Sequence, residues 1–157
     1  QESQVGKYVP QEPGLQVLVG NRWGNYGLFA LYAGDGRRLS TFQPDYVAES
    51  GPALNWAGDG QELALIVTDP TRAGAYDYRG RRLLDLTPFL PNGEGVFNLR
   101  GSLYFCQDVL GDPRDEIIMN ARGAVHIVTQ AEPLATGTRV YAPRKRFNVS
   151  HPGWAFV

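Results

Sequence analysis

Short apolar stretches separated by turn-forming residues run along the whole chain. The stretches are rich in Val, Leu, Ile, Tyr and Phe, and clusters of Gly, Pro, Asn and Asp interrupt them. No long amphipathic helical period is present, whereas short strands bounded by turn residues are typical of antiparallel sheets. The sequence therefore predicts an all-β fold with many strands, tight turns and little helix.

Three segments of the chain resemble one another, which indicates an internal repeat. Each is a polar turn containing Gly or Pro that leads into an apolar strand: Gly6–Gly20, Ala53–Val67 and Tyr104–Met119. Measured between Gln16, Glu62 and Glu116, the repeat is 46 and then 54 residues. That spacing is close to the roughly 40–50 residues of a four-stranded propeller blade.

The strands that follow are joined by turns of hairpin type. Asp35-Gly36-Arg37 and Arg79-Gly80-Arg81 each lie between apolar stretches, and a central Gly suits the positive φ of a tight hairpin turn. We therefore predict a partial β-propeller of about three four-stranded antiparallel blades, at about residues 5–50, 51–100 and 101–157.

A propeller of this size leaves surfaces uncovered. Closed propellers have roughly 4–8 blades, and an open arc exposes strand edges and inner faces. We expect the remainder of the propeller, another chain or self-association to complete the structure. The chain begins at Gln1 rather than Met, so we interpret it as a processed or excised product.

Charge and hydropathy indicate which kinds of partner the chain is suited to bind. The formal net charge is −1, so no overall field favours nucleic acid or a membrane surface. No apolar run approaches the roughly 20 residues of a membrane span. Among the 15 cations, all but Lys7 and Lys145 are Arg. Arg pairs bidentately with carboxylates, which favours an acidic ligand; a compositional bias of the genome is the alternative.

The turn of the third repeat, "DVLGDPRDEIIMN", has the most acidic side chains. Asp108, Asp112 and Glu116 recur every four residues, and Asp115 precedes the last of them. Clustered carboxylates repel one another unless a cation lies among them. Ca²⁺ suits such oxygen ligands, and these four residues are our predicted calcium ligands. An internal salt bridge from Arg114 is the alternative.

The turn of the second repeat has a similar but less charged set. Asn55, Asp59 and Glu62 are spaced like the acids of the third repeat, and they form a second candidate calcium site. A plain Asp-Gly turn explains the same residues equally well.

Aromatic and basic residues are candidates for binding a sugar acid. Trp23 could stack on a sugar face, and Arg144 and Arg146, with Arg114, could pair with carboxylates. His151 lies in a rigid "HPGW" turn. The alternatives are core packing for the Trp, a solvated turn for the basic run and structural capping for the His.

The order of several motifs resembles a known family. "NWAGDGQELALI", "YDYRGRRLL", "DVLGDPRDEIIM", "HIVTQ" and "RVYAPRKRFNVSHPGWAFV" are similar, in this order, to the C-terminal half of rhamnogalacturonan lyases of polysaccharide lyase family eleven. The most specific parts are Gly111–Ile117 and Asn148–Phe156. The resemblance implies a secreted, calcium-binding β-propeller that cleaves the rhamnose–galacturonate backbone of pectin by β-elimination. It assigns no catalytic residue in this chain.

Two classes of function follow from these observations. In the first, the chain acts on or binds an acidic polysaccharide, with a cation or Arg neutralising the uronate while a base removes the proton. In the second, it is a non-catalytic extracellular protein that binds carbohydrate, adheres or self-assembles, and calcium only stiffens its loops. An integrin-like propeller repeat is a third alternative.

Overall fold

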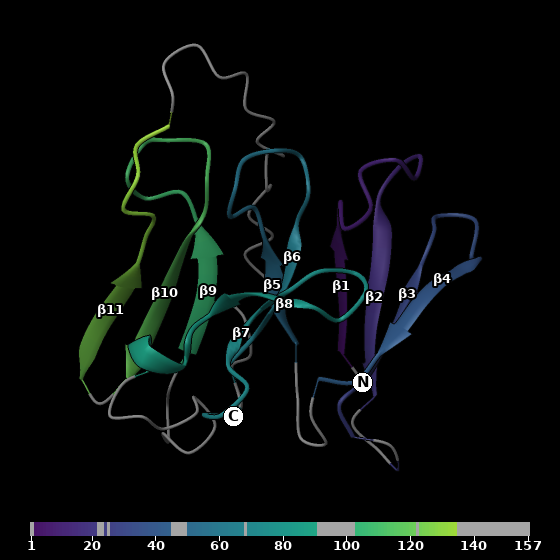
Figure 1. The fold of residues 1–157 in the computed structure, drawn as a ribbon, viewed down its shortest axis with the longest axis horizontal. Coiled ribbons are helices and arrows are strands. Elements are labelled where there is room, and N and C mark those ends of the chain that lie inside the picture. The colour runs from purple at the N-terminus through teal and green to yellow at the C-terminus, as the bar shows by residue number, and fades with distance from the viewer. Residues whose placement is uncertain are drawn as a thin grey trace.

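The computed structural model describes residues 2–21, 24, 26–44, 50–67, 69–90, 103–121 and 123–134 of the 157. These ranges form three small antiparallel sheets side by side, which confirms the predicted all-β, partial propeller-like fold (Figure 1). The only helical element within them is a 3-10 turn, η1 (Thr87–Phe89). No helix in the described ranges is long and apolar enough to cross a membrane.

Each sheet is a meander in which strands pair in chain order. The first sheet contains β1 (Glu2–Gly6), β2 (Gln16–Asn21), β3 (Leu28–Tyr32) and β4 (Arg38–Phe42). The middle sheet contains β5 (Ser50–Leu54), β6 (Leu63–Ile66), β7 (Gly74–Tyr76) and β8 (Arg82–Asp85). The third sheet contains β9 (Leu103–Gln107), β10 (Glu116–Ala121) and β11 (Ala124–Val128), so its described part has three strands where four were predicted.

The first strands of the three sheets are neighbours in space. β1 lies against β5, and β5 lies against β9. The remaining strands of each sheet follow outward from this row, as in the blades of a propeller. We call the three sheets blades and the regions between them junctions.

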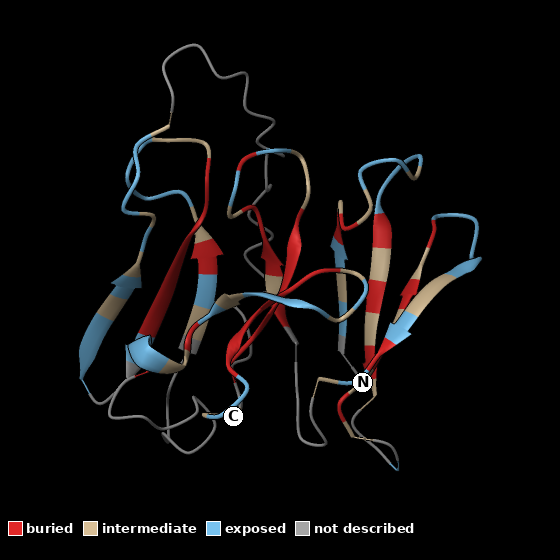
Figure 2. Cartoon of the chain, viewed as in Figure 1, coloured by how far each residue is buried: buried red, intermediate tan, exposed pale blue. Residues whose placement is uncertain are grey.

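The middle blade is buried on both faces, and this explains its composition. Ala64 and Ile66 of β6 belong to the apolar cluster shared with the first blade, whereas Leu63 and Leu65 belong to the cluster shared with the third. Successive residues of a strand point to opposite faces, so a strand buried on both sides has no polar position. Every residue of β6 is accordingly buried (Figure 2).

The two predicted hairpin turns are present. Gly36 and Gly80 adopt φ values of 86° and 77°, which a residue with a Cβ rarely adopts. The turn at Gly80 also packs against the neighbouring blade, because a Cβ added there would lie 2.6 Å from the Cβ of Phe42 in β4. Gly36 has nothing within 4 Å of the same point. The second turn therefore contributes to a junction as well as to its own hairpin.

Candidate functional site: acid-bearing loops at the blade junctions

The loops between the first and second strands of the blades carry most of the predicted site residues. Gln16, Leu63 and Glu116 are equivalent, because each begins the second strand of its blade and pairs with the last residue of the first strand. The loop residues immediately before them, Glu62 in the middle blade and Asp115 in the third, are therefore also equivalent. The sequence alignment of Glu62 with Gln16 and Glu116 was wrong by one residue.

The loops of the middle and third blades share one local conformation. The carboxylate of Asp59 accepts a hydrogen bond from the amide of Gln61 at 3.0 Å, and that of Asp112 accepts one from the amide of Arg114 at 2.8 Å. The residue before each aspartate is a glycine with positive φ, 70° in the middle blade and 87° in the third. Short polar side chains that bond two residues ahead stabilise such turns. Asp59 and Asp112 therefore shape their own loops.

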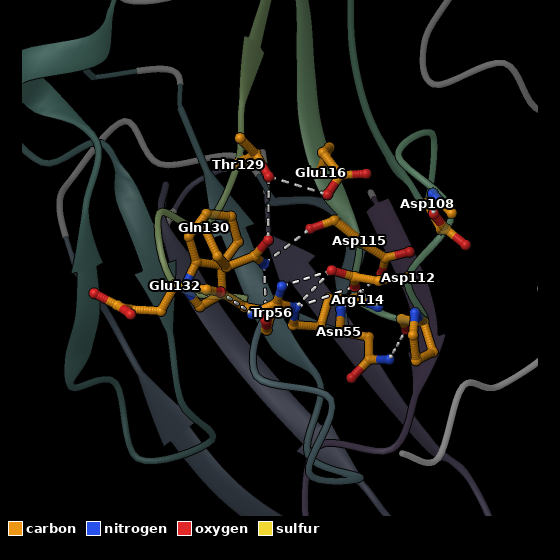
Figure 3. Close-up of polar contacts among 12 residues, drawn as sticks. Asn55, Trp56, Asp108, Asp112, Arg114, Asp115, Glu116, Thr129, Gln130 and Glu132 are labelled. Atoms are coloured by element: carbon orange, nitrogen blue, oxygen red, sulfur yellow. Dashed lines mark hydrogen bonds and ion pairs between the residues drawn. The ribbon is translucent and has the colours of Figure 1, made fainter. Parts of the chain in front are cut away.

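Asp115 joins the third blade to the middle blade. Its Oδ2 accepts a hydrogen bond from the backbone N–H of Asn55 at 2.7 Å, and its own N–H donates to the carbonyl of Asn55 at 2.9 Å (Figure 3). The side-chain amide of Asn55 adds a third bond, donated to the carbonyl of Pro113 at 2.9 Å. Asn55 and Asp115 are both buried, so these bonds lie out of water, where an unpaired group is costly.

The same arrangement joins the middle blade to the first. Glu62 Oε2 accepts a hydrogen bond from the backbone N–H of Lys7 at 2.6 Å, and the N–H of Glu62 donates to the carbonyl of Lys7 at 2.8 Å. Lys7 and Asn55 each follow the last residue of the first strand of their blades. We call each of these two-way contacts, Lys7–Glu62 and Asn55–Asp115, a junction pair. Each consists of an acid on one blade and the main chain of the preceding blade.

The side chains of Gln16 and Glu116 form hydrogen bonds within their own blades rather than between blades. Gln16 Oε1 accepts from the amide of Val9 at 3.0 Å, and Glu116 Oε2 accepts from the amide of Val109 at 2.9 Å. The other carboxylate oxygen of Glu116 accepts from the Thr129 hydroxyl at 3.2 Å. Both side chains are fully buried. They hold their loops closed, which leaves no oxygen of Glu116 without a protein donor.

Arg114 is the cation that faces the third loop. Its guanidinium pairs with Asp112, with Nη2 to Oδ2 at 2.5 Å and Nε to Oδ1 at 3.1 Å, and Nη1 donates to the carbonyl of Glu132 at 3.0 Å. The hydrogen bond from Arg114 holds the pKa of Asp112 below its ordinary value. Arg114 is itself buried. Arg114 therefore supplies a positive charge beside Asp112, as expected from the internal salt bridge predicted from the sequence as the alternative to Ca²⁺.

The predicted calcium ligands do not share one point in this arrangement. Asp108 is exposed and accepts from the amide of Gly111 at 2.8 Å, apart from the Asp112–Arg114 pair in Figure 3. Asp115 and Glu116 are bonded to different partners, as described above. Within the described ranges, no group of three or more His, Cys, Asp and Glu side chains is placed to hold a metal. Calcium binding stays a prediction.

The second candidate calcium set, Asn55, Asp59 and Glu62, is also divided among other contacts. Asp59 bonds within its turn, Glu62 bonds to the first blade, and Asn55 bonds to the third. The acidic loops thus form an arrangement that fixes main-chain groups at the junctions. This is their clearest chemical property in the described structure.

Four of the predicted sugar-binding residues lie outside the described residues, and their predictions stay untested: Trp23, Arg144, Arg146 and His151.

The sequence reading missed two contributors to the junctions. Lys7 takes part through its main chain, which no side-chain pattern reveals. Gln130 donates from Nε2 to the carbonyl of Trp56 at 2.8 Å, which adds to the three hydrogen bonds of Asn55 between the third and middle blades. A glutamine just after a strand is a common residue, so nothing in the sequence marked it.

Comparisons with protein-family models, curated proteins and solved structures find no match to this chain. The resemblance to rhamnogalacturonan lyases accordingly stays a prediction. The geometry of the loops is therefore the basis for the function proposed below.

Proposed function

We propose that this chain is a non-catalytic, assembly-forming portion of a β-propeller-type protein, in which acidic residues at the loops hold successive blades together. The junction pair is the observation that supports this most directly. It occurs at both junctions with the same four main-chain and side-chain roles. Glu62 and Asp115 are 4% and 6% exposed, so their hydrogen bonds to the preceding blade lie out of water, which supports a structural role.

The lyase alternative has less support from the same loops. Metal-assisted β-elimination requires a cation or Arg free to neutralise the uronate, and a base beside the acidic carbon. Arg114 is engaged by Asp112 and by the carbonyl of Glu132. Binding of an acidic polysaccharide, secretion and lyase activity therefore stay predictions from the sequence.

Hydrogen exchange of two backbone amides tests the proposed role. The Lys7 amide donates to Glu62 and the Asn55 amide donates to Asp115, so both should be protected in the folded protein. Glu62→Ala should release the Lys7 amide and leave Asn55 protected, and Asp115→Ala should do the reverse. Each variant is the control for the other. Equal loss at both amides, or at neither, would contradict two separate junction pairs.

Two further measurements test the sequence-based alternative. A ligand that binds only the folded state raises the melting temperature, so a calcium site requires a lower midpoint in a chelator than in calcium. A rhamnogalacturonan substrate incubated with the protein should absorb in the ultraviolet if unsaturated uronate ends form. We expect neither effect from an assembly-forming portion.

A further inference from the structure

The first two blades each present an apolar pair of side chains, at equivalent positions of their second and third strands, to the blade that follows. In β2 and β3, Leu18 pairs with Leu31, and both face the middle blade. In β6 and β7, Leu65 pairs with Ala75, and both face the third blade. These four side chains are each no more than 1% exposed. They form the apolar half of each junction.

Within the described part of the chain, no further blade lies over the equivalent pair in the third blade. Ile118 of β10 pairs with Ile127 of β11 and with Phe105 of β9. Their neighbours Cys106, Ile117 and Met119 belong to the cluster with the middle blade. By strand alternation, Phe105, Ile118 and Ile127 therefore face outward.

The edges of this face are exposed, whereas its centre is buried. Ile127 is 51% exposed, Phe105 is 38% exposed and Val125 on the same face is 64% exposed, while Ile118 between Phe105 and Ile127 is 6% exposed. An apolar row of this kind marks an interaction surface rather than scattered surface residues. We call Phe105, Ile118, Val125 and Ile127 the open face.

The third blade also has the main-chain position that forms the polar part of a junction pair in the other blades. Lys7 and Asn55 follow the first strands of their blades and give their main chains to an acid of the next blade. Asp108 occupies the same position after β9 and is exposed. Within the described ranges, no acid of another blade reaches its main chain. The third blade therefore offers both the apolar and the polar halves of a further junction.

We propose that the open face and the main chain of Asp108 receive a further propeller-type blade that carries Asp or Glu immediately before its second strand. This inference rests on the proposed function and specifies its partner. The partner's packing surface would be apolar, as Ala53, Ala64 and Ile66 are on the face that the middle blade presents to the first.

A second copy of this chain does not fit the rule. Its first blade is the one that would dock head to tail, and the residue immediately before Gln16 in that blade is Leu15. Leu15 is 49% exposed, and its side chain has no hydrogen-bond acceptor. The expected occupant is therefore a blade with the shape of this chain's first blade but with Asp or Glu in place of Leu15.

Thiol labelling tests first whether the face is open in the isolated chain. Cys106 is the only cysteine and is buried, so a new surface cysteine is labelled selectively. Ile127→Cys should react at a rate similar to Leu83→Cys, because Leu83 is 55% exposed on β8. Strong protection of Ile127→Cys alone would mean that other residues of the chain cover the face, and the proposal would fail.

A chain with the missing acid then serves as the probe. Leu15→Glu places a carboxylate where the middle blade has Glu62, and Leu15→Gln is the uncharged control. Sedimentation equilibrium should show head-to-tail association of Leu15→Glu about tenfold or more tighter than wild type or the Gln variant, since a hydrogen bond to a charged group is worth about that factor. Adding Ile127→Lys should abolish it.

The remaining outcomes each decide against the proposal. Equal association of wild type and Leu15→Glu through Ile127 would identify a second copy as the occupant. No gain for Leu15→Glu would show that the acid does not select the partner, and a gain that survives Ile127→Lys would show that the association does not use the open face. None of these variants alters Lys7, Glu62, Asn55 or Asp115, so the exchange experiment on the junction pairs is scored separately.

Discussion

Removal of the Asp115 carboxylate should destabilise the protein far more than removal of a neighbouring one. Asp115→Ala leaves the N–H of Asn55, a residue only 2% exposed, without its acceptor at 2.7 Å. Hydrogen bonds to charged groups contribute about 1.5–3 kcal/mol, and an orphaned buried donor costs about 1–3 kcal/mol. The two figures describe the same lost interaction and are not added, so we expect a loss of about 2–3 kcal/mol in the free energy of unfolding.

The assay is urea and thermal unfolding of matched variants. For a chain of this size each 1 kcal/mol shifts the melting temperature by about 2–4 °C, so Asp115→Ala should lower it by roughly 4–12 °C. Asp115→Asn keeps an acceptor oxygen but loses the charge, and should cost about half as much, because charge-assisted bonds are roughly twice as strong as neutral ones.

Asp108→Ala is the matched control, with the same change of charge in the same loop. Asp108 is exposed, and among the described residues its carboxylate bonds only the nearby amide of Gly111, so we expect a loss of about 0.5 kcal/mol or less. The reasoning would be refuted if Asp115→Ala cost no more than Asp108→Ala. It would also be refuted if Asp115→Asn cost as much as Asp115→Ala, because the acceptor oxygen would then be irrelevant.

Two further predictions concern a turn and a titrating group. Gly80→Ala should cost about 2–4 kcal/mol of unfolding free energy in a denaturant titration, because of its positive φ and its contact with Phe42. Gly36→Ala is the control, with a similar φ and open space around it, and should cost only about 1–2 kcal/mol. Equal losses would contradict the contribution of the Phe42 contact. Asp112 has a lowered pKa in the folded state, so its stabilisation is present above the pKa of the unfolded chain and is lost as pH falls through the folded value. Arg114→Met should therefore raise the pKa of Asp112 toward its ordinary value in a carboxyl NMR titration, and an unchanged value would show that Arg114 is not the cause.

The sequence predicted the strands and turns because both depend on local patterns. The hairpin glycines Gly36 and Gly80 were found since a tight turn needs a residue that tolerates positive φ. The Asp112–Arg114 pair was one of two readings of the third loop, since a carboxylate and a guanidinium two residues apart can meet without tertiary contacts. These features require no knowledge of neighbouring blades.

Register between repeats could not be predicted from residue types. The sequence aligned polar Glu62 with polar Gln16, yet strand pairing aligns Gln16 with apolar Leu63. The loop that precedes Gln16 is one residue longer than the loop of the middle blade. Loop length and burial on both faces set this register, and neither is visible before the blades are assembled.

The partners of the acids were hidden for a different reason. Each junction pair joins a carboxylate to a backbone N–H and C=O, and every residue except Pro has both groups. The side chains of Lys7 and Asn55 therefore carry no signal of this role. The sequence marks only the acidic half of the contact, which by itself is equally suited to a metal.

Calcium binding and blade joining would draw on the same carboxylates. A cation that drew Asp112 and Asp115 together would compete with the Arg114 guanidinium at Asp112, and at Asp115 Oδ2 it would compete with the buried N–H of Asn55. A carboxylate has two oxygens and about four acceptor sites, so calcium could also use the other oxygen of Asp115 and leave the junction pair closed. A ligand shifts a conformational equilibrium only by its preference for one state. Calcium that displaces the Asn55 N–H from Oδ2 should therefore lower the exchange protection of the Asn55 amide as the ion binds, whereas calcium that uses only the other oxygen should leave that protection unchanged.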